Sequence, residues 1–248
     1  MRRHWKRIAG IAIAVLLLVG VLGYLWLTNL ADPMPEAEAA LVSDDAVTVD
    51  TDPWLTFTPA EASSTGLILY PGGRVPAEAY APSVRVIAEA GYTSIIPSMP
   101  FGLAVLDANA ADGIIEAHPE IARWVIAGHS LGGAMAAQYA DGHDLDGLAL
   151  WAAYPPDGTD LSAAELAATS VYATEDGLTT LDEVEASRAQ LPADTTFVEI
   201  AGGNHAGFGW YGEQDGDGTA TISRAEQQAQ VTAATLELLE EVEAGPSS

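Results

Sequence analysis

The sequence predicts an α/β domain of three layers, in which helices cover both faces of a mostly parallel sheet. Segments with strand character alternate with segments of helical character along most of the 248 residues, which is the pattern of parallel strands joined by helices. The run 66–70 is apolar throughout, as expected for a strand that is buried on both faces. A chain of this length can bury one sizeable core and carry an appendage.

Apolar runs, periodicity and turn residues place the elements in order. The predicted strands are 46–50, 54–58, 66–70, 92–96, 124–127, 148–151, 170–173 and 196–200. The predicted helices are 78–90, 105–117, 134–140, 162–168, 181–190 and 223–243. Asp52-Pro53 turns the chain between the first two strands, Gly91 ends the first helix and Pro97 ends the strand that follows it. His118-Pro119 closes the second helix.

The N-terminus has the pattern of a membrane anchor. Residues 8–27 carry no charge and are nearly all apolar, so that a helix of this length would cross a bilayer. A basic cluster precedes them and acidic residues follow, which keeps the N-terminus in the cytoplasm and places the domain outside. We expect residues 1–28 to be a basic stub and a single-pass anchor in the cell membrane. The alternative is a signal peptide whose cleavage would give a secreted domain, although Asn29 stands where a cleavage site needs a small residue.

The rest of the chain is strongly acidic. The chain has 9 basic and 35 acidic residues; four of the basic ones precede the anchor and no acid precedes Asp32, which leaves 5 and 35 outside, a formal charge of −30. This charge argues against nucleic acid, anionic lipid and polyanionic substrates as partners. A strongly negative surface is consistent with a soluble domain, including one in a salty medium, because ions screen the repulsion between like charges. Cysteine is absent, which excludes disulfides and lipid attachment through an N-terminal cysteine.

Composition also sets the domain limits. Pro, Ala and Glu dominate 31–40, so we expect a linker over 29–45. The α/β domain then covers 46–244, and 245–248 form a tail.

The sequence Gly128-His129-Ser130-Leu131-Gly132 lies between a predicted strand and an Ala-rich helix. In that setting a Gly-x-Ser-x-Gly turn presents its serine hydroxyl above the sheet, and Ser130 is the candidate nucleophile. Gly128 and Gly132 leave room for close backbone approach. The N-terminus of the following helix favours negative charge at Ser130.

A serine nucleophile needs a base, and the base needs an acid that orients it. Enzymes with this turn use the order Ser, acid, His along the chain, and His205, just past the last predicted strand, fits that order best of the five histidines. Asp176 follows a strand and precedes a glycine, which makes it the preferred acid. Glu175 is the alternative, and Asp157 and Asp160 are simpler to interpret as solvated loop residues.

Two backbone N–H groups are candidates for an oxyanion hole. The N–H of Leu131 directly follows the nucleophile. The second donor is expected in the Pro71-Gly72-Gly73-Arg74 turn, and Gly73 is the preferred residue.

These motifs resemble the α/β-hydrolase superfamily, in particular the small single-domain enzymes related to dienelactone hydrolase and to esterases and lipases. The resemblance covers roughly residues 66–227 and rests on five segments: 70–73, 97–105, 128–133, 175–177 and 204–212. It implies the triad Ser130, Asp176 and His205. Dienelactone hydrolase itself uses a cysteine nucleophile, which this chain lacks, so its substrate is not carried over.

Many members of this superfamily insert a cap domain, for which the segment 152–169 is too short, so we expect a fairly open site. Five residues are candidates for an apolar wall around an acyl group, and the sequence is equally compatible with a place in the core for each of them: Phe101, Leu103, Trp151, Tyr154 and Phe208. The loop 213–219 starts like a calcium loop, but Arg224 stands where a bidentate glutamate is needed, so we expect a structured polar loop and no metal.

The sequence therefore predicts a membrane-anchored serine hydrolase that faces outward and cleaves a carboxylic ester of a small molecule through an acyl-enzyme intermediate. No cofactor is implied: the phosphate-binding loop of nucleotide enzymes is missing, and Lys6 is the only lysine. Two alternatives are a non-catalytic surface binding protein that keeps the fold, and an acyltransferase or thioesterase that uses the same triad. The oligomeric state stays open.

Overall fold

The structure is a computed structural model that describes residues 17, 18, 20, 21, 23 and 29–245. The chain divides into two units, Met1–Leu30 and Ala31–Ser248. In the first unit, residues 17, 18, 20, 21 and 23 are helical. Among the residues described, no helix is both long enough and apolar enough to cross a membrane. Most of the predicted anchor, residues 8–27, lies outside the described residues, so the anchor stays a prediction.

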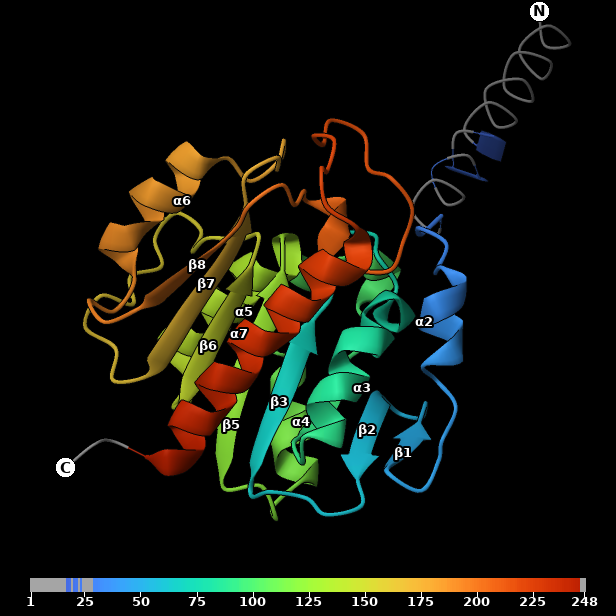
Figure 1. The fold of residues 1–248 in the computed structure, drawn as a ribbon, viewed down its shortest axis with the longest axis vertical. Helices are drawn as coiled ribbons and strands as arrows, with labels where there is room; N and C mark the ends of the chain where they lie inside the picture. Colours follow the sequence, from blue (N-terminus) through green and yellow to red (C-terminus); the bar gives the residue numbers. More distant parts are fainter. Residues whose placement is uncertain (1–16, 19, 22, 24–28, 246–248) are drawn as a thin grey trace, which may run out of the picture. The chain divides into compact units, whose positions relative to one another are not determined.

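The described part of the second unit forms one sheet of eight strands (Figure 1). In spatial order the strands are β1 (Val47–Asp50), β2 (Leu55–Pro59), β4 (Thr93–Ile96), β3 (Thr65–Tyr70), β5 (Arg123–His129), β6 (Gly147–Trp151), β7 (Ala167–Ala173) and β8 (Thr196–Ile200). The pairs β1–β2 and β2–β4 are antiparallel, and all pairs from β4 to β8 are parallel. This confirms the predicted three-layer α/β class with a mostly parallel sheet.

Helices cover both faces of the sheet (Figure 1). The helices α3 (Ala81–Glu89) and α7 (Arg224–Ala244) share one core cluster, and α4 (Ala110–Ala117) and α5 (Leu131–Gly142) share the other. Successive side chains of β3 alternate between the two clusters: Leu67 and Leu69 face α3 and α7, whereas Ile68 and Tyr70 face α4 and α5. All four are fully buried, which explains why β3 is apolar along its whole length.

Side-chain caps fix the N-terminal ends of two helices. Thr180 and Glu183 form a capping box at α6 (Leu181–Ser187), and Ser223 and Glu226 form another at α7. Short 3-10 turns complete the chain at η1 (Ala77–Tyr80), η2 (Pro100–Gly102), η3 (Ala104–Leu106), η4 (Arg188–Gln190) and η5 (Ala206–Phe208).

The segment predicted as a linker, 29–45, contains a packed helix instead. The helix α2 (Pro35–Ala39) buries Ala37 completely. Backbone N–H groups tie the preceding residues to the domain, with Ala31 donating to Arg74 O at 2.9 Å and Met34 to Trp210 O at 2.9 Å. The domain therefore begins near residue 31 and not at 46.

Four predicted helices differ from the structure. The segment 78–90 is divided into η1 and α3, and the segment 181–190 is divided into α6 and η4. The segment 105–117 is divided into η3 and α4, because Asp107 and Asn109 favour turns over helix interiors. The segment 162–168 forms a turn and then the start of β7, whose Ala167 pairs with Gly147 of β6. Pairing in the parallel sheet outweighs the helix propensity of that Ala-rich stretch.

Candidate active site

Backbone strain is concentrated at one edge of the sheet. Among the described residues, four that are not glycine have positive φ: Arg74, Phe101, Ser130 and Ala152. They follow the C-terminal ends of β3, β4, β5 and β6 respectively. Strained residues persist where the surrounding structure holds them, and they gather at functional sites. This edge is also where ligands bind to open α/β sheets.

Ser130 occupies a sharp turn between β5 and α5. Its φ of 52° and ψ of −123° lie outside the helical and extended regions, and its N–H donates to Trp151 O at 3.0 Å. A Cβ at Gly132 would collide with the carbonyls of Tyr70 and Pro71, and one at Gly128 would collide with Gly132. The two glycines of the motif therefore allow the close approach that the sequence predicted, and the turn presents Ser130 half-buried at the edge of the sheet.

Asp176 and His205 form a buried pair. Asp176 Oδ2 lies 2.8 Å from His205 Nδ1, and both side chains are nearly inaccessible to solvent. Asp176 Oδ1 accepts N–H bonds from Leu178 at 2.8 Å and Thr179 at 2.7 Å. A carboxylate so placed can accept a hydrogen bond from Nδ1–H, and in the neutral imidazole that carries this proton Nε2 has a lone pair. The alternative acid, Glu175, is exposed and points to Thr174.

His205 Nε2 is buried and has no hydrogen-bond partner among the described residues, Ser130 included. The His205 ring nevertheless lies against His129, the neighbour of Ser130, with ring centroids 4.7 Å apart. Hydrogen bonds between base and nucleophile are often formed only in the substrate complex. The structure thus places the His205 ring beside the serine turn, with no hydrogen bond between Nε2 and Ser130.

The two predicted oxyanion donors are neighbours. The Leu131 side chain lies 3.4 Å from where a Gly73 Cβ would stand. Gly72 N–H donates to Tyr80 Oη at 2.9 Å and Arg74 N–H donates to Gly102 O at 2.6 Å. Among the described residues, the N–H group of Gly73 therefore has no hydrogen-bond partner, unlike those of its two neighbours. The Leu131 N–H, at the first position of α5, has no partner within the helix.

Tyr80 and His129 support the site, and sequence analysis did not assign them a role. Tyr80 Oη lies 2.8 Å from His129 Nδ1 and also accepts the Gly72 N–H, so it links the oxyanion turn to the serine turn. Burial, and then the charge of His205, hold the pKa of His129 well below its usual range. Phe208 stacks on the His129 ring, with the ring centroids 5.6 Å apart. The only sequence signal for this support was the place of His129 next to Ser130.

The five predicted pocket residues differ in their exposure to solvent. Trp151 is fully buried and donates to Thr235 of α7, and Phe208 is fully buried against His129, so neither can form an open wall. For these two residues the structure shows the alternative, a place in the hydrophobic core. Phe101 is 45% exposed, and Leu103 and Tyr154 are half-buried.

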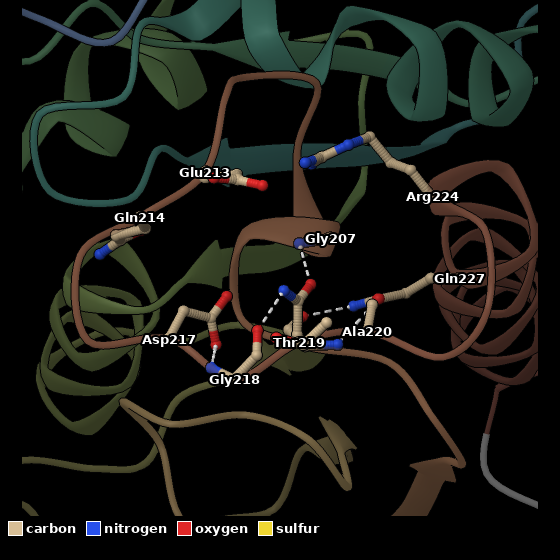
Figure 2. Close-up of a pocket in the computed structure, with 10 residues that line it drawn as sticks. Gly207, Glu213, Gln214, Asp217, Gly218, Thr219, Ala220, Arg224 and Gln227 are labelled. Carbon is tan, nitrogen blue, oxygen red and sulfur yellow. Dashed lines mark hydrogen bonds between the residues drawn. The ribbon is translucent and has the colours of Figure 1, made fainter.

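A cavity of about 360 Å³ is lined by the loop that carries His205, through Asn204 and Gly207, and by residues between 213 and 227 (Figure 2). Its lining is mostly polar and does not include Ser130 or any predicted pocket residue: Asn204, Gly207, Glu213, Gln214, Asp217, Gly218, Thr219, Ala220, Arg224 and Gln227. Among the described residues, no group of three or more histidine, aspartate or glutamate side chains is placed to hold a metal ion. The loop predicted as structured and polar lines this cavity.

Comparison with known proteins agrees with the fold. The sequence profile of the alpha/beta hydrolase family matches residues 66–229, and the chain belongs to this family. No curated protein matches the chain. The superfamily resemblance of the motifs is thereby confirmed.

Solved structures share the fold at low sequence identity. An Agrobacterium tumefaciens protein of unknown function, described as a candidate alpha/beta hydrolase, has a TM-score of 0.58 and 13% identity over 82% of this chain and 100% of its own. Thermogutta terrifontis esterase 2, phosphonylated by sarin, has a TM-score of 0.55 and 14% identity over 79% and 94%. An alpha-beta serine hydrolase homologue from Coxiella burnetii has a TM-score of 0.53 and 16% identity over 79% and 98%.

Proposed function

We propose that this member of the family is a serine hydrolase that cleaves a carboxylic ester, or a related acyl bond, of a small molecule. The observation that carries the proposal is the buried Asp176–His205 pair at 2.8 Å, beside a serine with positive φ. The esterase and serine hydrolase folds among the similar structures support it.

The proposed reaction has two stages. His205 Nε2 takes the proton of the Ser130 hydroxyl as the oxygen attacks the acyl carbon, while Asp176 holds Nδ1–H and the ring orientation. The N–H groups of Leu131 and Gly73 stabilise the negative oxygen of the tetrahedral intermediate. The leaving alcohol takes the proton from His205, and the acyl group stays on Ser130. Water, activated by His205, then releases the acid.

The test is ester hydrolysis by the full chain in detergent, beside Ser130→Ala and His205→Ala. We expect hydrolysis of short and medium acyl esters by the native protein, and a loss of about 10³-fold or more in each variant. Circular dichroism shows whether the variants are folded. Folded native protein that cleaves neither esters nor thioesters would support a non-catalytic binding role instead. Transfer of the acyl group to an alcohol in preference to water would identify an acyltransferase.

We further propose that residues 8–27 anchor the domain in the cell membrane, with the domain outside the cytoplasm. The uncharged run and its basic flank support this. Alkaline carbonate washing should leave the protein with the membrane, and protease added to intact cells should remove the domain. Release of a chain that lacks the first residues would show a cleaved signal peptide.

A further inference from the structure

We propose that Asp217 is a positioning residue, whose carboxylate ties the loop that carries Asp176 to the loop that carries His205. The inference rests on the proposed serine hydrolase function and deepens it. Asp217 makes no hydrogen bond with Ser130 or with the side chains of Asp176 and His205. It acts on the acid and the base through backbone N–H groups of their loops.

The carboxylate of Asp217 accepts hydrogen bonds from four backbone N–H groups. Its Oδ1 accepts from Gly177 at 3.2 Å, His205 at 3.1 Å and Gly218 at 2.7 Å, and its Oδ2 accepts from Ala206 at 2.8 Å. Figure 2 shows the side chain above Gly218 at the edge of the polar cavity. One carboxylate therefore holds the amide of the base itself and the amide that directly follows the acid.

An aspartate suits this position chemically. An ionised carboxylate has about four lone-pair sites and no hydrogen to donate, so it can accept four N–H bonds at once. The negative charge strengthens such bonds relative to neutral ones. An asparagine of the same size has one acceptor oxygen, and its amide nitrogen would face an N–H group.

The backbones of the two loops are packed closely enough for this contact. A Cβ at Gly218 would collide with the carbonyl oxygen of Glu175, and Gly216 has a φ of 88°. The sequence Gly216-Asp217-Gly218 thus turns the loop back against the residues next to Asp176. The acidic pattern that resembles a calcium loop here binds backbone N–H groups.

A second contact joins the two loops through residues that precede Asp176 and His205 in the sequence. Glu175 N–H donates to Gly203 O at 2.8 Å, which joins the loops before Asp176 and His205. Asp217 joins them again directly after both residues, so the acid and the base lie between two links. Gln227 of α7 accepts from Asn204 N–H at 3.1 Å and donates to Asn204 O at 2.7 Å, which fixes the base loop to the helix. Among the described residues it makes no hydrogen bond to the acid loop.

The test compares Asp217→Asn with Asp215→Asn in the full chain. Asp215 lies on the same loop, is exposed and makes no hydrogen bond or ion pair with the described residues, so its variant is a control of equal charge. A small displacement of catalytic groups can cost about 100-fold in rate. We expect kcat for ester hydrolysis to fall about 10- to 100-fold in Asp217→Asn, with KM nearly unchanged, and to stay native in Asp215→Asn.

A spectroscopic readout separates positioning from general stability. The proton shared by His205 and Asp176 should give a downfield NMR resonance in the native protein and in Asp215→Asn. It should broaden or disappear in Asp217→Asn at temperatures where that variant is folded. A native kcat and an unchanged resonance in folded Asp217→Asn would overturn the proposal.

Two further outcomes are distinguishable. If native protein does not hydrolyse esters but the resonance depends on Asp217, the proposed function fails while the link between the loops is real. If Asp217→Asn does not fold, amide exchange in the native protein decides: the N–H groups of Gly177, His205 and Ala206 should exchange slowly. Exchange as fast as at exposed Glu213 contradicts the link.

Discussion

Asp176 and Glu175 are adjacent acids with similar chemistry, and the backbone decides between them. The N–H groups of Leu178 and Thr179 hold one oxygen of Asp176, which directs the other at His205. A neutral amide at this position would favour the wrong tautomer of the imidazole. The acid thus sets the orientation of the base and the nitrogen that carries its proton.

Replacing Asp176 with asparagine should therefore lower kcat for ester hydrolysis by about 10³- to 10⁴-fold while the fold is kept. The change keeps the size of the side chain and removes its charge. Glu175→Gln is the matched control, since Glu175 is exposed, and should retain most of the activity. A larger loss of kcat in Glu175→Gln than in Asp176→Asn would show that Glu175 is the acid.

His129 makes the stability of the domain depend on pH. Burial, followed by the charge of His205, lowers its pKa well below the ordinary value of about 6.5. The unfolded chain therefore takes up a proton as the pH falls through about 6.5, while the native chain does not. The stabilising contribution is complete above that pH and is lost below it.

We expect the uptake of a proton by His129 in the unfolded chain to lower the free energy of unfolding by about 1 kcal/mol when the pH is lowered from 6.5 to 5.5. Urea unfolding of the native protein and of His129→Gln at both pH values measures the difference. Other titrating groups affect both proteins alike, so the steeper fall in the native protein isolates His129. Equal pH dependence in the two proteins contradicts a neutral, buried His129.

At the scale of elements, the start of α7 supports the base loop. The capping box of Ser223 and Glu226 begins the helix, and Arg224 in the first turn donates to the carbonyls of Ala206 and Gly209. The helix start is thus part of the support for His205, although it contributes no side chain to the acid–base pair.

Ser223→Ala should cost about 1 kcal/mol of stability, because the helix loses its cap. Denaturant unfolding measures the loss, and Ser98→Ala, at an exposed loop position, should change stability little. A loss as small as that of the control would mean that the cap does not contribute to the folded state.

Local patterns predicted most elements, and tertiary packing explains the failures. The apolar runs of β3 and β5 and the glycines around Ser130 are specified by residues close in sequence. The linker prediction failed because the composition of α2 does not show the surface against which Ala37 is buried. The strand start at Ala167 was missed because it depends on pairing with β6, which a local pattern cannot show.

The same limit applies to the site. Ser130 was predicted from its Gly-x-Ser-x-Gly motif and His205 from its place after the last predicted strand, both of which are local features of the sequence. The role of Tyr80, on η1, depends on a contact with His129, 49 positions away. For Trp151 and Phe208 the sequence left pocket wall and core open, because it does not distinguish a buried aromatic residue from one that lines a pocket, and both are buried in the structure.

At the scale of the whole molecule, acidic charge dominates. With 5 basic and 35 acidic residues after position 28, like charges repel across the domain surface, and dissolved salt screens this repulsion.

Thermal unfolding of the protein in detergent should therefore shift to higher temperature as NaCl is added. The first additions should have the largest effect, because the Debye length shortens from about 30 Å at 0.01 M to about 10 Å at 0.1 M. A melting temperature that falls steadily with NaCl contradicts net repulsion as the dominant electrostatic effect.

The central claim is that Ser130 is an activated nucleophile, and labelling with a fluorophosphonate tests it most directly. The full chain is treated with the probe, digested, and analysed by mass spectrometry to locate the adduct. We predict one phosphonylated residue, Ser130, with labelling lost in Ser130→Ala and strongly slowed in His205→Ala. Folded native protein that stays unlabelled, or that carries the adduct at another serine, contradicts the account.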